Sequence, residues 1–270
     1  MNIVVCLKQV PDTTEVKIDP VTGTLMRDGV PSIINPDDKS GLEAALSLRD
    51  QTGGMVTVLS MGPPQADLAL REALAMGADN AILLSDRGFG GADTWATSLT
   101  LATALRKLEW DLVICGRQAI DGDTAQVGPE IAEHLDIPQV SYVSEIRIDQ
   151  DRKGTNGQPA ALIVRRNFED GWQLARIALP CLLTTMKDLG KPRYMTVAGA
   201  FDAYRKEIPV WGLADIGMDP KAAGLGGSPT RVKQSFTKGA RQAGKVYETD
   251  PVDGAKIIVE KLKEKFIIGR

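Results

Sequence analysis

The chain has 270 residues, of which 43% are hydrophobic and 25% are charged, a globular composition that excludes a collagen-like, mucin-like or wholly disordered protein. Its formal net charge is only −3, so we expect no binding to nucleic acid. The longest apolar runs, residues 3–7 and 112–115, are too short to cross a bilayer, and no secretory signal pattern opens the sequence. We therefore expect neither membrane insertion nor secretion.

Cysteine and histidine are scarce in this sequence. The three cysteines, Cys6, Cys115 and Cys181, are far apart, and no CxxC pair occurs. This usage indicates a cytoplasmic protein without a zinc or iron–sulfur site. Since there is also only one histidine, His134, we expect any redox chemistry to use a bound organic cofactor.

The first half of the chain alternates short apolar runs with helical patterns. The runs at 3–7, 55–60, 81–85 and 111–116 are typical of strands covered on both faces. Apolar stripes at helical spacing include Leu42, Leu70, Trp95 and Val127. Repeated strand–helix–strand units with right-handed crossovers predict an α/β fold: an open, parallel, doubly wound sheet with flavodoxin-like layering. Residues 10–36 interrupt the first crossover and are either an ordered functional excursion or a decorated surface loop.

From residue 139 the pattern changes. Short alternating segments at 143–148, 160–164 and 173–179 predict an antiparallel extension of the sheet edge, and residues 181–185 predict one more strand. Residues 187 to about 250 show little periodic structure, which is typical of disorder or of a segment laid against a partner. A final amphipathic helix is expected to begin at Pro251, capped by Asp250 or Thr249.

In an open parallel sheet, ligands bind beyond the carboxyl ends of the strands, which here nominates residues 8–10, 61–63, 88–94 and 116–128. The strongest candidate is 116–128, because its small and polar residues lead into a helix whose free N–H groups and dipole can hold a phosphate. Thr124 is expected to cap this helix or bind the phosphate, while Asp121 and Asp123 cap N–H groups or bind ribose hydroxyls. An ordinary capped loop is the alternative. The turn before Trp95 is either a second phosphate contact or an N-cap.

Several familiar motifs are missing. No GxGxxG follows the first strand, and neither a GxxxxGK[ST] nor a GxSxG occurs. His134 is interpreted as a surface or packing residue. For the adjacent carboxylates Asp37 and Asp38, helix capping is the simpler reading.

The sequence resembles the beta (small) subunit of electron transfer flavoproteins over essentially its whole length. The resemblance depends on several separated motifs, namely Val5-Cys6-Leu7-Lys8-Gln9-Val10-Pro11, Ile34-Asn35-Pro36, Ala73-Leu74-Ala75-Met76-Gly77-Ala78-Asp79, Gly116-Arg117-Gln118-Ala119-Ile120-Asp121, Arg166-Asn167-Phe168-Glu169-Asp170-Gly171 and Lys191-Pro192-Arg193-Tyr194. The resemblance implies an electron-carrying heterodimer with an alpha subunit and no catalytic side chain in this chain. The nucleotide-binding positions it implies are Cys6, Asn35, Asp37, Asp38, Met61, Gly62, Thr94, Gly116, Arg117, Gln118, Ala119, Asp121, Gly122, Asp123, Thr124, Ala125, Gln126 and Val127.

Residues 24–34 and the turn at 92–94 are similar to the electron-bifurcating branch of the family. This resemblance implies FAD in place of AMP, with NADH giving a hydride to the flavin. One electron would pass to ferredoxin or flavodoxin and the other, through the flavin of the alpha subunit, to an acyl-CoA dehydrogenase. Arg117 is either a cation near the flavin or its phosphates or a solvated surface residue. The alternatives are a non-bifurcating carrier that holds structural AMP and a stand-alone adenine-nucleotide-binding module.

The resemblance also divides the chain into three parts. Residues 1–186 would form the nucleotide-binding domain, 187–200 a partner-recognition loop, and 201–270 a C-terminal arm whose helix docks on the alpha subunit. Leu189, expected to be exposed at the tip of the loop, would anchor the acyl-CoA dehydrogenase. A plain turn at the strand exit is the alternative for that loop.

Overall fold

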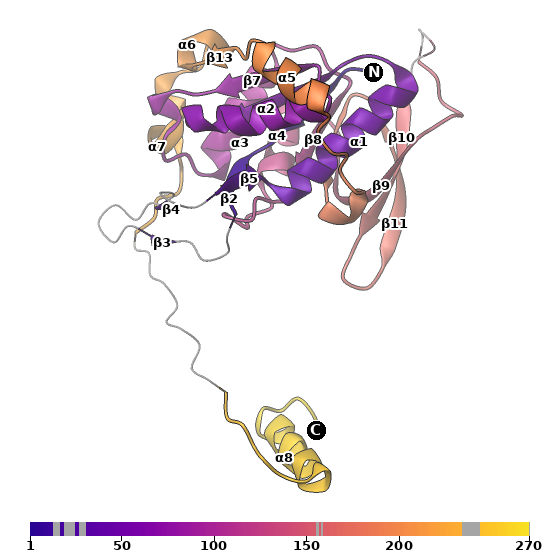
Figure 1. Ribbon diagram of the computed structural model, residues 1–270, viewed down its shortest axis with the longest axis vertical. Coiled ribbons are helices and arrows are strands. Elements are labelled where there is room, and N and C mark those ends of the chain that lie inside the picture. The colour runs from indigo at the N-terminus through magenta and orange to yellow at the C-terminus, as the bar shows by residue number, and fades with distance from the viewer. Residues whose placement is uncertain are drawn as a thin grey trace. The chain divides into compact units, whose positions relative to one another are not determined.

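The computed structural model describes residues 1–12, 17–18, 25–26, 31–154, 157, 159–233 and 244–269. The chain divides into two compact units, Met1–Gln234 and Ser235–Arg270, which are described separately below (Figure 1). The division into three functional parts stays a prediction.

One large sheet organises the first unit. In the described part of the chain, its strands follow the order β11-β10-β9-β12-β8-β1-β6-β7-β13 (Figure 1). Their bounds are β1 Ile3–Cys6, β6 Val56–Met61, β7 Asn80–Leu84, β8 Leu112–Gly116, β9 Gln139–Ile148, β10 Ala161–Asn167, β11 Trp172–Ala178, β12 Cys181–Thr185 and β13 Val210–Trp211. The pairs from β9 through β12, β8, β1, β6 and β7 to β13 are all parallel, and β10 pairs antiparallel with β9 and β11. The predicted parallel sheet with an antiparallel extension is confirmed.

Helices cover both faces of this sheet. They are α1 Pro36–Thr52, α2 Asp67–Met76, α3 Thr94–Leu105 and α4 Val127–Leu135. Because successive side chains of a strand point to opposite faces, Val5 packs in one core cluster with Leu42 and Leu70, and Val4 packs in the other with Leu105 and Ile131. Helices α1 and α2 thus cover one face, and α3 and α4 cover the other. This arrangement confirms the doubly wound fold.

The predicted excursion at 10–36 is described only in part. Strand β2 (Gln9–Pro11) pairs antiparallel with β5 (Ser32–Ile34), and β3 (Lys17–Ile18) pairs antiparallel with β4 (Leu25–Met26). Residues 13–16, 19–24 and 27–30 of this segment lie outside the described residues, so its expected functional role stays a prediction.

The expectation of little regular structure after residue 187 is wrong for residues 187–233. This stretch contains η3 Lys187–Leu189, α5 Val197–Arg205, β13, α6 Leu213–Ile216, η4 Pro220–Ala222 and α7 Gly224–Gly227. Helix α5 is stabilised by contacts with α2. The Arg71 guanidinium of α2 donates to the carbonyl of Lys206, at the end of α5, at 2.6 Å. A Cβ on Gly199 would lie 2.5 Å from the carbonyl oxygen of Ala75, so α5 and α2 approach closely there. Such tertiary contacts leave no periodic signal in the sequence.

The second unit contains helix α8, Pro251–Glu264. Its N-cap is Asp250, whose side chain accepts from the N–H groups of Val252 at 2.9 Å and Asp253 at 3.1 Å, so the predicted helix and cap are confirmed. Its apolar residues Ile258 and Val259 are exposed. Among the described residues of the whole chain, no helix has the length and hydropathy required to span a bilayer.

Candidate functional site

A large cavity lies at the carboxyl ends of the central strands. It has a volume of about 1260 Å³, above the range of roughly 300–1000 Å³ that is usual for small-ligand sites. Its lining comes from the ends of β1, β6, β7 and β8 and from the turns that follow them, including Cys6, Met61, Asp86, Gly116 and Val127. The cavity therefore occupies the edge of the sheet at which the topology predicts a ligand.

Most of the predicted site residues line this cavity. They are Cys6, Asp38, Met61, Gly62, Thr94, Gly116, Arg117, Gln118, Ala119, Gly122, Asp123, Thr124, Ala125, Gln126 and Val127. Asn35, Asp37 and Asp121 are not among the lining residues, but each contacts a residue that is: Asn35 contacts Gln118, Asp37 contacts Arg117, and Asp121 contacts Lys8. Leu189 lies in a separate loop.

Asn35 fixes the loop that follows β8. Its side chain is fully buried, its amide donates to the carbonyl of Gln118 at 2.8 Å, and its Oδ1 accepts from the N–H of Ile120 at 3.1 Å. One amide thus satisfies a donor and an acceptor of the same loop, a pattern that sets the loop conformation. Asn35 acts on the cavity through this loop.

Asp38 joins two strand ends at the cavity floor. Its two carboxylate oxygens accept from the N–H of Lys8 at 2.7 Å and from that of Gly116 at 2.9 Å. Burial raises the pKa of Asp38 to about 7, against the lowering effect of Asn35 and of these two N–H groups. Asp38 therefore makes contacts between elements at the first turn of α1, in place of the simple capping that the sequence suggested.

Lys8 and Asp121 form an ion pair at the same edge. The Lys8 ammonium lies 2.7 Å and 2.9 Å from the two carboxylate oxygens of Asp121, whose side chain is only 3% exposed. Asp123 accepts from the side-chain amide of Gln118 at 2.7 Å. Asp121 and Asp123, which were expected to cap N–H groups or bind ribose hydroxyls, are thus each bound to a side-chain donor of the protein itself.

The start of α4 keeps free backbone donors. Among the described residues, no side chain caps this helix, so Thr124 does not act as the expected cap. By contrast, Asp93 caps α3 by accepting from the N–H of Ala96 at 3.0 Å, so the turn before Trp95 is an N-cap. Uncapped N–H groups at a cavity suit a phosphate, and the residues present therefore fit a phosphate-bearing ligand such as a nucleotide.

Two further residues that line the cavity, Glu130 and Thr230, were not predicted from the sequence. Glu130 lies in the first turn of α4 and accepts from the hydroxyls of Thr94 at 3.2 Å and Ser98 at 3.1 Å. Thr230 reaches the cavity from a distant segment, and its hydroxyl donates to the Asp93 carboxylate at 2.7 Å. The place of Glu130 just after the candidate segment 116–128 could have indicated it. The aperiodic sequence around Thr230 contains no signal that could have indicated its place in the cavity.

Two comparisons with known proteins identify the family. The electron transfer flavoprotein domain matches residues 22–216 of this chain. The chain is also 57% identical over 268 residues to the electron transfer flavoprotein subunit beta of Clostridium acetobutylicum, which covers 99% of this chain and 100% of that protein. The chain belongs to the electron transfer flavoprotein family.

Other relatives of this electron transfer flavoprotein beta subunit carry more specific names. It is 55% identical over 271 residues to the caffeyl-CoA reductase-Etf complex subunit CarD of Acetobacterium woodii, covering 99% of this chain and 100% of that protein. It is 47% identical over 275 residues to the protein FixA of Azorhizobium caulinodans, covering 98% of this chain and 95% of that protein. Family membership implies a role in electron transfer, an alpha subunit partner and a general association with flavin or AMP.

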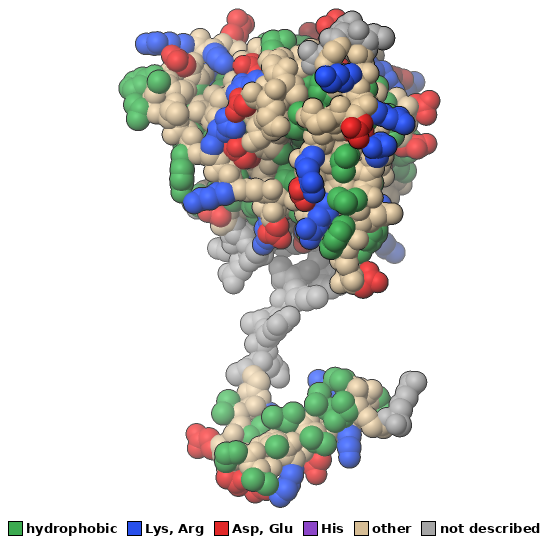
Figure 2. All heavy atoms as spheres, turned by 90° about the vertical axis from the view of Figure 1, so that its right-hand side faces the viewer, with side chains coloured by type: hydrophobic (Ala, Val, Ile, Leu, Met, Phe, Trp, Pro, Cys, Tyr) green, Lys and Arg blue, Asp and Glu red, His purple; other side chains and the backbone are tan. Residues whose placement is uncertain are grey.

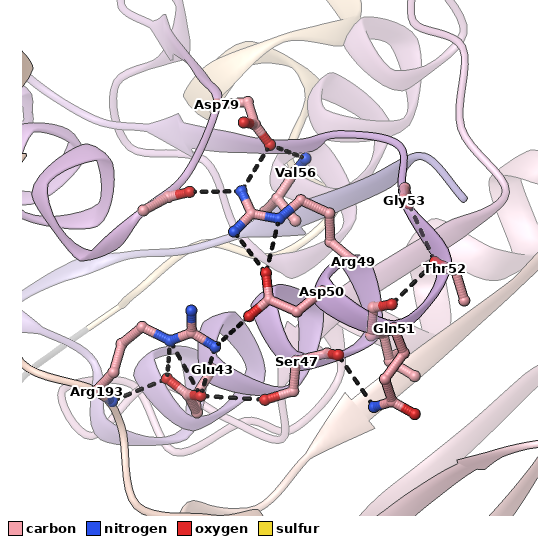
Figure 3. Close-up of polar contacts among 12 residues, drawn as sticks. Glu43, Ser47, Arg49, Asp50, Gln51, Thr52, Gly53, Val56, Asp79 and Arg193 are labelled. Carbon is pink, nitrogen blue, oxygen red and sulfur yellow. Dashed lines mark hydrogen bonds and ion pairs between the residues drawn. The ribbon is translucent and has the colours of Figure 1, made fainter.

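In this beta subunit, the expectation that Leu189 is exposed is wrong. Leu189 is partly buried and packs against the core, because the single turn of η3 folds it back and its N–H donates to the carbonyl of Met186 at 3.0 Å. The same loop is fastened to α1 at Arg193, whose guanidinium donates to the Glu43 carboxylate at 2.9 Å (Figure 3). The loop is thus held at both ends. Its expected role with a partner stays a proposal.

His134 is not among the residues that line the cavity, and it packs edge-on against Trp95, which is, with ring centroids 4.7 Å apart. Burial lowers the pKa of His134. This placement confirms the interpretation of His134 as a packing residue.

Proposed function

We propose that this beta subunit binds FAD in the cavity at the sheet edge, oxidises NADH there, and sends the two electrons along different routes in the cytoplasm. One electron goes to ferredoxin or flavodoxin, and the other goes through the FAD of the alpha subunit to an acyl-CoA dehydrogenase. When bound, the flavin supplies the chemistry that accepts a hydride and releases single electrons. The protein supplies binding and orientation.

The observation that carries this proposal is the extent of the cavity. A single space of about 1260 Å³ runs from the uncapped start of α4 past the strand ends to Arg87, Asp93 and Trp95. Since ordinary small-ligand sites reach about 1000 Å³, this space favours a dinucleotide over AMP. In this proposal, residues from Gly116 to Val127, which line the cavity, hold its phosphates, and Arg117 adds a positive charge beside them.

The name of one relative supports the proposed electron acceptor. CarD is described as a subunit of a caffeyl-CoA reductase-Etf complex, and it matches this chain from end to end. FixA matches it over nearly the same length. We infer from the first name that the electron acceptor of this chain is also an enzyme acting on an acyl-CoA.

The outer face of β10 and β11 is our candidate for contact with the alpha subunit. Trp172 and Leu174 are exposed there, and the Arg165 guanidinium lies 5.0 Å from the centroid of the Trp172 ring. Figure 2 views the molecule from this side and shows hydrophobic and basic side chains next to each other. Interfaces between protein chains are enriched in aromatic residues and arginine, which supports this assignment. The exposed apolar residues of α8 suit the same partner.

The loop carrying Leu189 is our candidate for contact with the acyl-CoA dehydrogenase. Leu189 is partly buried, while its neighbours Lys187, Asp188 and Gly190 are exposed. An apolar side chain within a polar rim is a common arrangement of binding hot spots. Partner binding at this loop would cover the exposed part of Leu189.

Counting the cofactors in the purified heterodimer tests the proposal. Two FAD molecules per heterodimer, with flavin absorbance bleached by NADH under anaerobic conditions, are expected. One FAD with one AMP would make this chain a non-bifurcating carrier, and absence of any flavin would make it a nucleotide-binding module. A heterodimer carrying Asn35→Ala should lose the cofactor of this subunit preferentially, because Asn35 fixes the loop at Gln118 and Ile120.

A further inference from the structure

Asp37 lies between the wall of the cavity and the loop that carries Leu189. One of its carboxylate oxygens, Oδ1, accepts from the N–H of Lys187 at 2.9 Å. The other, Oδ2, lies 3.4 Å from Nε of Arg117. Arg117 lines the cavity, and Lys187 is the first residue of η3. One carboxylate, itself only 10% exposed, therefore contacts both the cofactor site and the base of the partner loop.

Further hydrogen bonds make these contacts a connected unit. The Thr185 hydroxyl is within 3.2 Å of the carbonyl oxygens of both Asp37 and Cys115. The N–H of Arg117 donates to the carbonyl of Thr185 at 2.8 Å. The Ser40 hydroxyl donates to the carbonyl of Lys187 at 2.9 Å. The ends of β8 and β12 and the first turn of α1 are thus joined around Asp37.

Arg117 is the adjustable part of this unit. Among the residues that the structure describes, its buried Nε has no hydrogen-bond partner. The Asp37 oxygen lies 3.4 Å from it, beyond the usual hydrogen-bond length. The guanidinium carbon lies 5.9 Å from the Tyr142 ring centroid, and the side chain is 31% exposed. Charge holds Arg117 near Asp37 without fixing its geometry. An anionic group in the cavity can therefore form an ion pair with the same guanidinium and fix its orientation.

We propose that Asp37 couples the two sites, so that FAD in the cavity strengthens docking of the acyl-CoA dehydrogenase at the Leu189 loop, and docking tightens FAD. This inference rests on the proposed function. Its physical basis is that the cofactor phosphates order Arg117, Arg117 orders the Asp37 carboxylate, and that carboxylate holds the N–H of Lys187. A second ligand then finds part of this unit already ordered, so that less conformational entropy is lost when it binds. Because such coupling is reciprocal, either ligand should raise the affinity for the other equally.

The test uses the full heterodimer and its acyl-CoA dehydrogenase. The dissociation constant of FAD is measured with and without the dehydrogenase, and hydrogen exchange is measured at the amides of 187–189 with and without FAD. In the wild type, the dehydrogenase should tighten FAD about fivefold or more, within the usual range of coupling between sites. FAD should also slow exchange at Lys187. Each effect compares one measurement with and without the second ligand, so a change in the affinity of one ligand alone does not mimic it.

Asp37→Asn removes the charge opposite Arg117 but keeps an oxygen for the Lys187 N–H. It should reduce the coupling to less than about twofold, and Arg117→Gln should do the same. Combining the two should add nothing further. Asp50→Asn is the matched control on α1, because Asp50 contacts Arg193 of the same loop at 3.1 Å but does not line the cavity. The control should keep the wild-type coupling.

Two outcomes overturn the inference and are distinguishable. In the first, FAD and the dehydrogenase both bind, but either they bind independently in the wild type or their coupling persists in both Asp37→Asn and Arg117→Gln. The inferred coupling through Asp37 is then wrong, while the proposed function survives. If the heterodimer binds no FAD in this subunit, the proposed function and the inference fail together. Arg117→Gln keeps the test decisive should Asp37→Asn fail to fold.

Discussion

The Asp38 carboxylate and the backbone of Gly116 are in such close contact that no side chain larger than the hydrogen of glycine fits at position 116. The N–H of Gly116 donates to Oδ1 of Asp38 at 2.9 Å, and a Cβ on Gly116 would lie 2.0 Å from that oxygen. Gly116 is the last residue of β8 and the first residue of the proposed phosphate loop. The glycine is thus required by the approach of α1 to the strand end.

Gly116→Ala should therefore destabilise the chain strongly. The new methyl group would displace the Asp38 carboxylate and break its hydrogen bonds to the N–H groups of Gly116 and Lys8. Overpacking together with unsatisfied buried polar groups should lower the free energy of unfolding by about 3 kcal/mol. Urea denaturation followed by circular dichroism measures this loss.

Gly122→Ala is the matched control in the same loop. A Cβ at Gly122 meets nothing within 4 Å. Its unfolding free energy should stay within about 0.5 kcal/mol of the wild type. Equal losses in the two variants would show that loop flexibility, not the contact with Asp38, explains the effect.

The burial of Asp38 predicts a pH dependence of stability. Its pKa is about 7 in the folded chain and about 4 in the unfolded chain, so the folded state binds the extra proton between these values. The contribution of this group to stability is complete below pH about 4 and is lost as the pH rises through about 7. Relative to Asp38→Asn, the wild type should lose unfolding free energy across this window. Parallel pH profiles for the two proteins would contradict the prediction.

The sequence predicted those parts of the fold that are written in local patterns. Apolar runs such as Ile3–Cys6 and helical stripes such as that of α4 are signals within a few residues, and the parallel, doubly wound arrangement then followed from the handedness of crossovers. The edge of the sheet that carries the cavity followed from topology alone. Assignment of particular residues to a nucleotide came from the family resemblance.

What the sequence could not show depends on contacts between distant segments. Asn35 and Gln118 are 83 positions apart, so no local pattern reveals that one holds the other. Helix α5 depends on Arg71 of α2, and Leu189 is partly buried because η3 turns it toward the core. In each case the missing information was tertiary packing, which overrides local propensity.

Arg193 should hold the Leu189 loop in place. Its guanidinium donates to both oxygens of Glu43, at 2.9 and 3.0 Å, and to Asp50 at 3.1 Å (Figure 3). Burial acts to raise the pKa of Glu43, but Arg193 outweighs it and the pKa is lowered. Hydrogen bonds between charged groups in such a partly buried site stabilise by about 1.5–3 kcal/mol. Arg193→Ala should lower the unfolding free energy within that range and accelerate proteolysis of residues 187–195.

Arg205→Ala is the control for this prediction. Arg205 pairs with Asp202 at 3.3 Å, but the two side chains are 80% and 63% exposed, so the pair contributes little. Its removal should leave proteolysis of the loop unchanged. A loop cleaved at the wild-type rate in Arg193→Ala would show that other contacts, such as that of Asp37 with Lys187, hold it alone.

The outer face of β10 and β11 predicts how the heterodimer responds to surface mutation. Leu174 of β11 is 50% exposed and lies opposite Arg165 in the sheet, while Leu68 of α2 is 59% exposed. If the alpha subunit centres on β11, Leu174→Ala should weaken the heterodimer about tenfold, since the residues that cost more than about 1 kcal/mol when truncated cluster near the centre of an interface. Leu68→Ala, which removes the same atoms elsewhere, should bind like the wild type. Sedimentation of the mixed subunits measures both constants, and equal affinities for the two variants would place the alpha subunit on another surface.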